Sequence, residues 1–432
     1  MKMNPPVDYK NSVPNPDDIT RVELDNGIVV LARANFNSPS ISITGMLHVG
    51  SMYDPLDKLG LASITAGTLM RGTQNRDFQQ IFNQLESVGA SLGYSGGTHT
   101  SGFHGKSLAE DIDLMLEILG DTLRNPIFPK EQIERQRAQV LTGLALRAQS
   151  TGETAGMNFD KLLYPDHPYG LPNDGFVETV SSISRDDLLA FNQKHFGPKG
   201  MLIVVVGGID PQEAVEKVRK KLGDWQNKTQ PEIRQLPEWK QPTKTQRIRA
   251  EIPEMSQSDI VMGTAGPARS YQDYLQTSIA NNIFGQFGMM GRIGEVVREK
   301  SGLAYYAYSS LGSSYGPGPW AVAAGVNPSN EEKAVDLIKK EIKRLISEKV
   351  TEEELADVKA NYVGRIPLSL EANISVAATL LQMEKNQLGL DYLVRYPDLV
   401  NSITREDVQA AAANYLDPDK LVISIAGPPL ED

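Results

Sequence analysis

The chain has 432 residues, of which 40% are hydrophobic and 22% are charged, and its formal net charge is −11. This composition is typical of a globular protein with a large core. The acidic balance argues against general binding to nucleic acid or to anionic membranes. Because the sequence contains no cysteine, disulfides, thiolate zinc sites and cysteine nucleophiles are excluded.

No stretch reaches the ~18 apolar residues that a membrane-spanning helix needs, so we expect no membrane span. The first residues, Met1 to Pro6, lack the basic and then apolar layout of a signal peptide. The proline-containing polar arm Asn4–Asp18 is also what a removed signal peptide would leave behind. Both a cytoplasmic and a periplasmic location therefore fit the sequence.

The first half of the chain begins with strands and continues with helices. Asp25-Asn26-Gly27 predicts the turn of a hairpin over 20–34. The elements expected after it are a strand over 40–49, helices over 59–71 and 76–88, strands over 91–94 and 98–105, and then three helices. Runs of strands and helices without strict alternation favour an α+β fold, in which a mostly antiparallel sheet is covered by helices.

The second half repeats the first at an offset of 220 residues. Val180–Leu188 recurs as Val400–Val408, and each copy has Ser or Thr followed three positions later by an acidic residue. That spacing predicts a capping box at the start of a helix. Each copy then runs through a helix and a proline turn into a buried strand, over 201–206 and 421–426. A repeated unit of this length predicts two homologous domains.

A polar, proline-containing stretch, Trp225–Gln246, separates the two copies and is typical of an ordered linker. We therefore expect an N-terminal domain over 1–226, a linker over 227–245 and a C-terminal domain over 246–432. Within the second domain, the Gly- and Met-rich stretch Gly285–Gly291 is expected to be a loop. This loop either faces a substrate or partner, or only connects elements.

Three short segments resemble the pitrilysin/insulinase family of zinc metallopeptidases. They are Gly50–Pro55, Lys58–Ala62 and Leu69–Thr73. The family includes the mitochondrial processing peptidases and small bacterial heterodimeric peptidases. The resemblance implies the processing-peptidase/LuxS-like metallohydrolase fold. Active members carry His-x-x-Glu-His between the second and third segments, where two His one turn apart bind zinc and the Glu acts as general base.

This chain lacks that motif and reads Ser63-Ile64-Thr65-Ala66-Gly67 in its place. Ser63 and Gly67 stand at the two His positions, and Ala66 stands at the position of the general base. A second Glu on a later helix completes the family site, and its position falls on Gly143. Because these four positions carry no ligand for a divalent cation, we expect no catalytic residue, no metal and no cofactor in this chain.

The five histidines do not replace the missing site. None is three or four residues from another, which is the spacing that would place two on one helix face. His99 and His104 are expected on opposite faces of one strand, and His195 is expected to be structural. Neither a nucleophile elbow nor a phosphate-binding loop is found.

A different family signature is present in the second half. Residues 298–305 read Arg-Glu-Lys-Ser-Gly-Leu-Ala-Tyr and resemble a run in the family's C-terminal domain. In that family the Arg and the Tyr hold the substrate main chain, which here implies substrate binding by Arg298 and Tyr305. A guanidinium offers fixed donors to a carbonyl or carboxylate, and a phenol can donate to a carbonyl and to a tetrahedral intermediate. The strand at Gly96–Thr100 matches the family's peptide-binding edge strand.

These features predict a substrate-binding or regulatory subunit that is not an enzyme on its own. Its expected partners are an unfolded peptide and a homologous zinc-bearing subunit of a heterodimeric peptidase that degrades or processes peptides. A second hypothesis is a zinc-free structural or peptide-binding homodimer, which acts as a scaffold or chaperone. A third is an autonomous peptidase with an altered metal site.

Overall fold

The computed structural model describes residues 13–430, without the side chains of residues 288–290. Met1–Pro6 and most of the predicted polar arm lie outside the described residues. The chain folds into two compact units. The first comprises the residues up to Leu144 together with Pro172–Gln235 and Ile366–Arg395. The second comprises Ala145–Leu171, Leu236–Arg365 and the residues from Tyr396 onward.

The first unit contains a six-stranded sheet in the order β1-β2-β6-β3-β5-β4. Strands β2 and β6 are parallel, and the other neighbours are antiparallel. The predicted hairpin is confirmed, because β1 pairs with β2 around the Asp25-Asn26-Gly27 turn. The strands are β1 (Thr20–Glu23), β2 (Val29–Ala34), β3 (Ser40–Leu47), β4 (Ser91–Gly96), β5 (Ser101–Leu108) and β6 (Leu202–Gly207).

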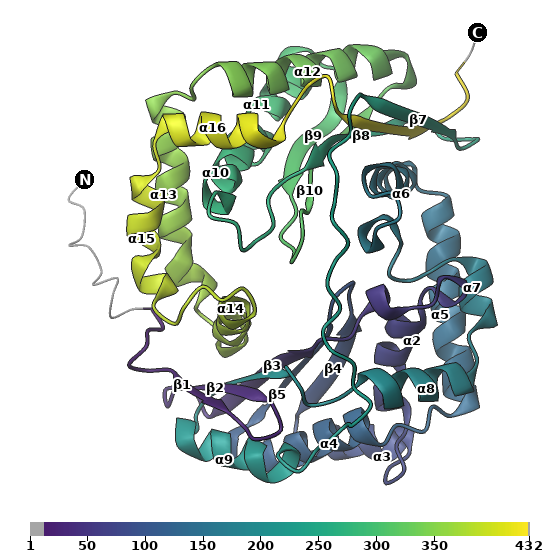
Figure 1. Cartoon of the computed structure of the whole chain (residues 1–432), viewed down its shortest axis with the longest axis vertical. Helices are drawn as coiled ribbons and strands as arrows, with labels where there is room; N and C mark the ends of the chain where they lie inside the picture. Colours follow the sequence, from purple (N-terminus) through teal and green to yellow (C-terminus); the bar gives the residue numbers. More distant parts are fainter. Residues whose placement is uncertain (1–12, 431–432) are drawn as a thin grey trace. The chain divides into compact units, whose positions relative to one another are not determined.

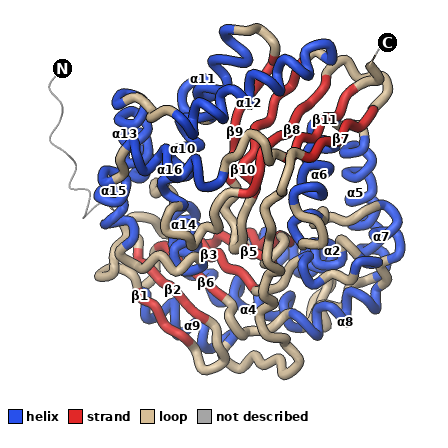
Figure 2. Tube along the Cα trace, turned by 45° about the horizontal axis from the view of Figure 1, so that its top comes forward, coloured by secondary structure: helices blue, strands red, loops and turns tan. Residues whose placement is uncertain are grey.

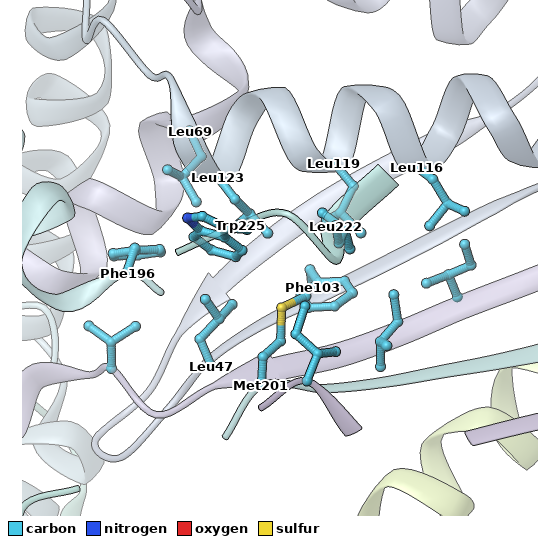
Figure 3. Close-up of a cluster of buried hydrophobic side chains, with 14 of the residues drawn as sticks. Leu47, Leu69, Phe103, Leu116, Leu119, Leu123, Phe196, Met201, Leu222 and Trp225 are labelled. Atoms are coloured by element: carbon cyan, nitrogen blue, oxygen red, sulfur yellow. The ribbon is translucent and has the colours of Figure 1, made fainter. Parts of the chain in front are cut away.

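Helices cover both faces of this sheet, and Figure 1 shows α14 on one side and α4 and α9 on the other. The main core lies under α4 and α9, where Phe103, Leu119 and Leu222 are fully or almost fully buried (Figure 3). The helices of this unit are α2 (Leu61–Thr68), α3 (Phe78–Ser87), α4 (Ile112–Arg124), α5 (Lys130–Ala148), α7 (Val177–Ser182), α8 (Arg185–His195), α9 (Pro211–Leu222) and α14 (Asn373–Lys385).

The second unit contains a five-stranded sheet in the order β7-β11-β8-β10-β9 (Figure 2). Its strands are β7 (Gln246–Glu251), β8 (Ser258–Ala265), β9 (Ala304–Leu311), β10 (Pro319–Val326) and β11 (Val422–Gly427). Its helices are α6 (Thr151–Leu163), α10 (Tyr274–Gly285), α11 (Phe287–Ile293), α12 (Glu331–Ser347), α13 (Glu352–Ser369), α15 (Tyr392–Ser402) and α16 (Arg405–Tyr415), with a π-helix, η6, over Gly294–Lys300.

The internal repeat is present in three dimensions. Apart from β1, both sheets have the same strand order, with one parallel pair and an edge strand (β4 or β9) that is the third from last in sequence. The two predicted capping boxes form at Ser184 with Asp187 and at Thr404 with Asp407. The predicted α+β fold of two homologous, mostly antiparallel units is therefore confirmed.

Each sheet is covered by one helix from the opposite half of the sequence. Helix α14 packs on the first sheet, where Val376 and Leu380 join a cluster with Val204. Helix α6 packs on the second sheet, where Phe159 joins a cluster with Val422. Each compact unit therefore contains one helix that comes from the opposite half of the sequence. The domain boundaries 1–226, 227–245 and 246–432 stay a prediction.

The expected loop at Gly285–Gly291 is wrong, because this stretch ends α10 and forms most of α11. The flanking Phe284 and Ile293 are buried, and burial of apolar side chains outweighs the weak helix propensity of glycine. Among residues 13–430, no helix is both long enough and apolar enough to cross a bilayer.

Candidate functional site

Helix α2, which carries the degenerate zinc positions, is held at its start by Asp54. Gly60 precedes the helix with φ of 97°, so it offers no side chain to cap the first turn. The buried Asp54 carboxylate replaces that cap, since Oδ2 accepts from the Gly60 N–H and Oδ1 from the Ala62 N–H, both at 2.9 Å. A carboxylate satisfies these free N–H groups and suits the positive end of the helix dipole.

Ala66 is buried on α2, whereas Ser63 and Gly67 are half-buried. A β-carbon built on Gly96, at the end of edge strand β4, would lie 3.1 Å from Cα of Ser63. Ala66 is only 1% exposed. A β-carbon built on Gly67 would lie 3.0 Å from the Gln136 side-chain nitrogen, so the amide of α5 fills the space beside Gly67.

Helix α5 brings Gln136, rather than Gly143, against α2. The two residues are seven apart, so they lie on one face of α5, two turns from each other. Gly143 is exposed, and nothing described lies within 4 Å of a β-carbon built there. Sequence reasoning missed Gln136, because only the packing of α5 on α2 singles it out from the other polar residues of this helix.

The four positions do not fit a zinc ion. They present one hydroxyl, one methyl and two glycines, whereas zinc sites in proteins use imidazole, thiolate or carboxylate ligands. Within residues 13–430, no group of three or more His, Asp or Glu side chains is close enough to share a metal ion.

The expected strand at Gly96–Thr100 is wrong, because Gly96 is the last residue of β4 and the residues from Gly97 to Thr100 form the turn to β5. The Ser51 and Met52 N–H groups donate to the carbonyls of Gly97 and Thr98, each at 3.0 Å. Asn173 Oδ1 also accepts from the Thr98 hydroxyl at 2.9 Å. The two carbonyls are therefore engaged by the chain itself, and β4, over 91–96, is the edge strand of this sheet.

Arg298 lies on the π-helix η6, half-buried, in the second unit. The Gly302 N–H donates to the Arg298 carbonyl at 3.0 Å, and Gly302 has φ of 61°, which favours glycine. Its guanidinium makes no hydrogen bond or ion pair with any other described residue. Single π-helical turns are frequent at functional sites, because they rotate side chains out of the regular helical register.

Tyr305 lies at a β-bulge on the edge strand β9. Tyr306 pairs with Gly325 of β10 and Ala304 pairs with Val326, so Tyr305 has no partner of its own in the ladder. The Tyr305 side chain is 65% exposed. Bulges at sheet edges often redirect one side chain. The two predicted substrate-binding residues therefore both lie at departures from regular secondary structure, within one short stretch of the second unit.

His195 lies in an aromatic cluster of the first unit. His195 packs between the rings of Tyr53 and Phe191, with centroids 5.1 Å and 4.7 Å away, and burial lowers its pKa to about 4. The expectation that His99 and His104 share a strand is wrong, because β5 begins at Ser101 and His99 belongs to the preceding turn.

Two family models match this chain. The model described as insulinase (peptidase family M16) matches residues 29–160, and the model described as the peptidase M16 inactive domain matches residues 182–362. Among curated relatives, an uncharacterized zinc protease of Mycobacterium leprae is 25% identical over 412 residues, which cover 92% of this chain and 89% of the relative. One from Rickettsia felis is 26% identical and covers 86% of each chain.

Solved structures agree with this assignment of the fold. A peptidase M16 inactive domain from Pseudomonas fluorescens superposes with a TM-score of 0.89 at 25% identity, over 95% of this chain and 98% of that one. A protease from Helicobacter pylori gives a TM-score of 0.87 at 19% identity, over 96% and 100%. A chain of complex III from Candida albicans gives 0.76 at 17% identity, over 94% and 95%, which shows the fold alone.

Proposed function

The chain belongs to the insulinase family of peptidases, family M16, and on that premise we propose that it is a non-catalytic, substrate-holding subunit of a heterodimeric zinc peptidase. Arg298 and Tyr305 bind the main chain of an unfolded peptide. A homologous partner subunit supplies the zinc ion and the general base, so the complex degrades or processes peptides that neither chain cleaves alone.

One contrast carries this proposal. The positions for zinc are filled by Ser63, Ala66, Gly67 and Gly143, while Arg298 and Tyr305 are kept and lie at a π-helix and a bulge. The Arg298 guanidinium has no ion-pair partner among the described residues and the Tyr305 phenol is exposed, so both groups are available to a peptide. The guanidinium supplies fixed donors to peptide carbonyls, and the phenol donates to the carbonyl under attack.

The test is peptide cleavage by this chain co-expressed with the zinc-bearing homologue from the same genome. We expect Arg298→Ala to raise KM and Tyr305→Phe to lower kcat/KM, each by roughly tenfold, or about 1.4 kcal/mol. Lys300→Ala, on the same π-helix, and Tyr271→Phe, at another exposed tyrosine of this unit, serve as matched controls. Unchanged kinetics in both Arg298 and Tyr305 variants would rule out the assigned role.

The second candidate is a zinc-free scaffold or peptide-binding homodimer. The observation in its favour is that the same fold occurs in a chain of a respiratory complex. Size-exclusion chromatography separates the two proposals. A subunit of a peptidase shifts to a heterodimer when the zinc-bearing homologue is added, whereas a homodimer keeps its elution volume.

A further inference from the structure

A hydrogen bond across the second sheet fixes the strand that carries Tyr305. Tyr306 on β9 lies opposite Gly325 on β10, and Gly325 lies opposite Asp259 on β8. The Tyr306 hydroxyl donates to Asp259 Oδ1 at 2.5 Å. The tyrosine therefore reaches from the edge strand over the neighbouring strand and is held by the third.

Glycine at position 325 makes this crossing possible. A β-carbon built there would lie 2.5 Å from the Tyr306 ring and 2.5 Å from the Gln257 amide nitrogen, closer than non-bonded atoms approach. Glycine in a strand often marks a place where another group approaches the backbone closely. Here the approaching group is the phenol ring of Tyr306 on the neighbouring strand β9.

Asp259 is a fixed acceptor. It is 4% exposed, and a buried carboxylate needs donors to compensate for the loss of water. Gln257 Nε2 donates to Oδ1 at 2.9 Å, and the hydroxyl of Thr151, the first residue of α6, donates to Oδ2. Burial and the neighbouring carboxylate raise the pKa of Tyr306, so its phenol keeps the proton that it donates.

The bulge begins at the residue that Asp259 holds. With Tyr306 fixed opposite Gly325, the next described pair is Ala304 with Val326, and Tyr305 is the extra residue between them. We propose that Tyr306 and Asp259 are positioning residues, whose hydrogen bond holds this bulge and so sets the direction in which Tyr305 presents its phenol to a peptide. This inference rests on the proposed function only for its last step, the use of Tyr305.

Loss of the bond has a specific consequence. Without the bulge, Tyr305 would pair with Val326, and a one-residue change of register turns a side chain to the opposite face of the sheet. The Tyr305 phenol would then point away from the face of the sheet on which it is now exposed. The bulge itself can be observed without any activity, because the amides near it exchange with solvent according to their pairing.

The experiment uses Tyr306→Phe, which removes one hydroxyl and keeps the ring over Gly325. Tyr415→Phe is the matched control, because the Tyr415 hydroxyl also bonds a carboxylate of this unit, that of Asp273, at 2.8 Å. Asp259→Asn is the second variant and removes the charge from the acceptor. Hydrogen exchange over 303–311 is measured on the chain alone, and kcat/KM is measured on its complex with the zinc-bearing homologue.

We expect Tyr306→Phe and Asp259→Asn to change the exchange pattern over 303–311 and to lower kcat/KM by roughly tenfold, while Tyr415→Phe changes neither. The double variant with Tyr305→Phe should be no slower than Tyr305→Phe alone, because both changes remove the same contact. Unchanged exchange in Tyr306→Phe overturns the inference, whatever the kinetics.

Changed exchange with full activity, in a complex that Tyr305→Phe does slow, overturns the positioning role and leaves the proposed function standing. A complex that neither Arg298→Ala nor Tyr305→Phe slows contradicts the proposed function instead. In that case, hydrogen exchange alone tests whether the Tyr306–Asp259 bond maintains the bulge.

Discussion

Gly67 illustrates at the level of one residue how the zinc site has been lost. Its missing side chain leaves room that the Gln136 amide of α5 occupies, so the two helices pack where active relatives of the family hold metal. The loss is therefore more than the absence of ligands, because a larger side chain at Gly67 would have to displace the Gln136 amide.

The position of Gln136 leads to a prediction about variants in which the two zinc-binding histidines are restored. A Ser63→His, Gly67→His variant places two imidazoles one turn apart, but the second must displace Gln136. Adding Gln136→Ala should raise the zinc affinity of the double variant by roughly tenfold, about 1.4 kcal/mol. Calorimetric zinc titration measures the change, with Gln139→Ala on the exposed side of α5 as the control. Equal affinities with and without Gln136→Ala would show that the amide does not block the site.

A partly buried ion pair joins the end of α11 to the start of α13, directly before the π-helix that carries Arg298. Arg292, at the end of α11 and 5% exposed, forms two hydrogen bonds to Glu354 near the start of α13, at 2.6 Å and 2.7 Å. The π-helix with Arg298 follows directly. Burial alone would raise the pKa of Glu354, but bonds from Arg292 and from the Thr351 N–H bring it down to about 2.

The sign of the pH dependence follows from this lowered pKa. The ion pair stabilises the folded state above the ordinary pKa of Glu354, 4.5, and that stabilisation is lost as the pH falls toward 2. Glu354→Gln should lower the free energy of unfolding at pH 7 by roughly 1–3 kcal/mol and flatten the decline between pH 4.5 and 2. Denaturant unfolding at several pH values tests this, with the exposed Glu353→Gln as the control. If the free energy of unfolding of Glu354→Gln fell between pH 4.5 and 2 as steeply as that of the unmodified chain, this ion pair would not be the source of the pH dependence.

Elements with local signals could be predicted from the sequence, and those set by tertiary packing could not. The Ser184 and Thr404 capping boxes and the Asn26-Gly27 turn are written in a few adjacent residues, and they appear where expected. No short motif marks the π-helix or the bulge, and the Tyr306–Asp259 bond next to the bulge joins residues 47 positions apart. Family resemblance singled out Arg298 and Tyr305, but only the structure shows how each is presented.

At the scale of the whole molecule, the exchange of α6 and α14 ties the two sequence halves together. Each sheet has one apolar face that is covered by a helix from the other half, with Val204 under α14 and Val422 under α6. A segment of 1–226 expressed alone would leave the α14 face of its sheet in water. Uncovered apolar surface of that kind destabilises a domain by about 25 cal/mol per Å².

We therefore expect that neither 1–226 nor 246–432 unfolds cooperatively alone, and that the two segments together do. Thermal unfolding followed by near-ultraviolet circular dichroism compares the separate segments with their mixture. The control is the full-length chain with a protease site inserted within 227–245, which is folded first and then cut at that site. A sharp, independent transition in either segment alone would show that the exchanged helix is dispensable.

We propose that this chain contributes substrate binding but no zinc to an active complex. The most direct measurement is zinc content together with peptide cleavage, for the chain alone and for its complex with the zinc-bearing homologue. We predict no stoichiometric zinc and no cleavage for the chain alone, and one zinc ion per heterodimer with cleavage for the complex. Stoichiometric, chelator-sensitive zinc and cleavage by the chain alone would contradict the account.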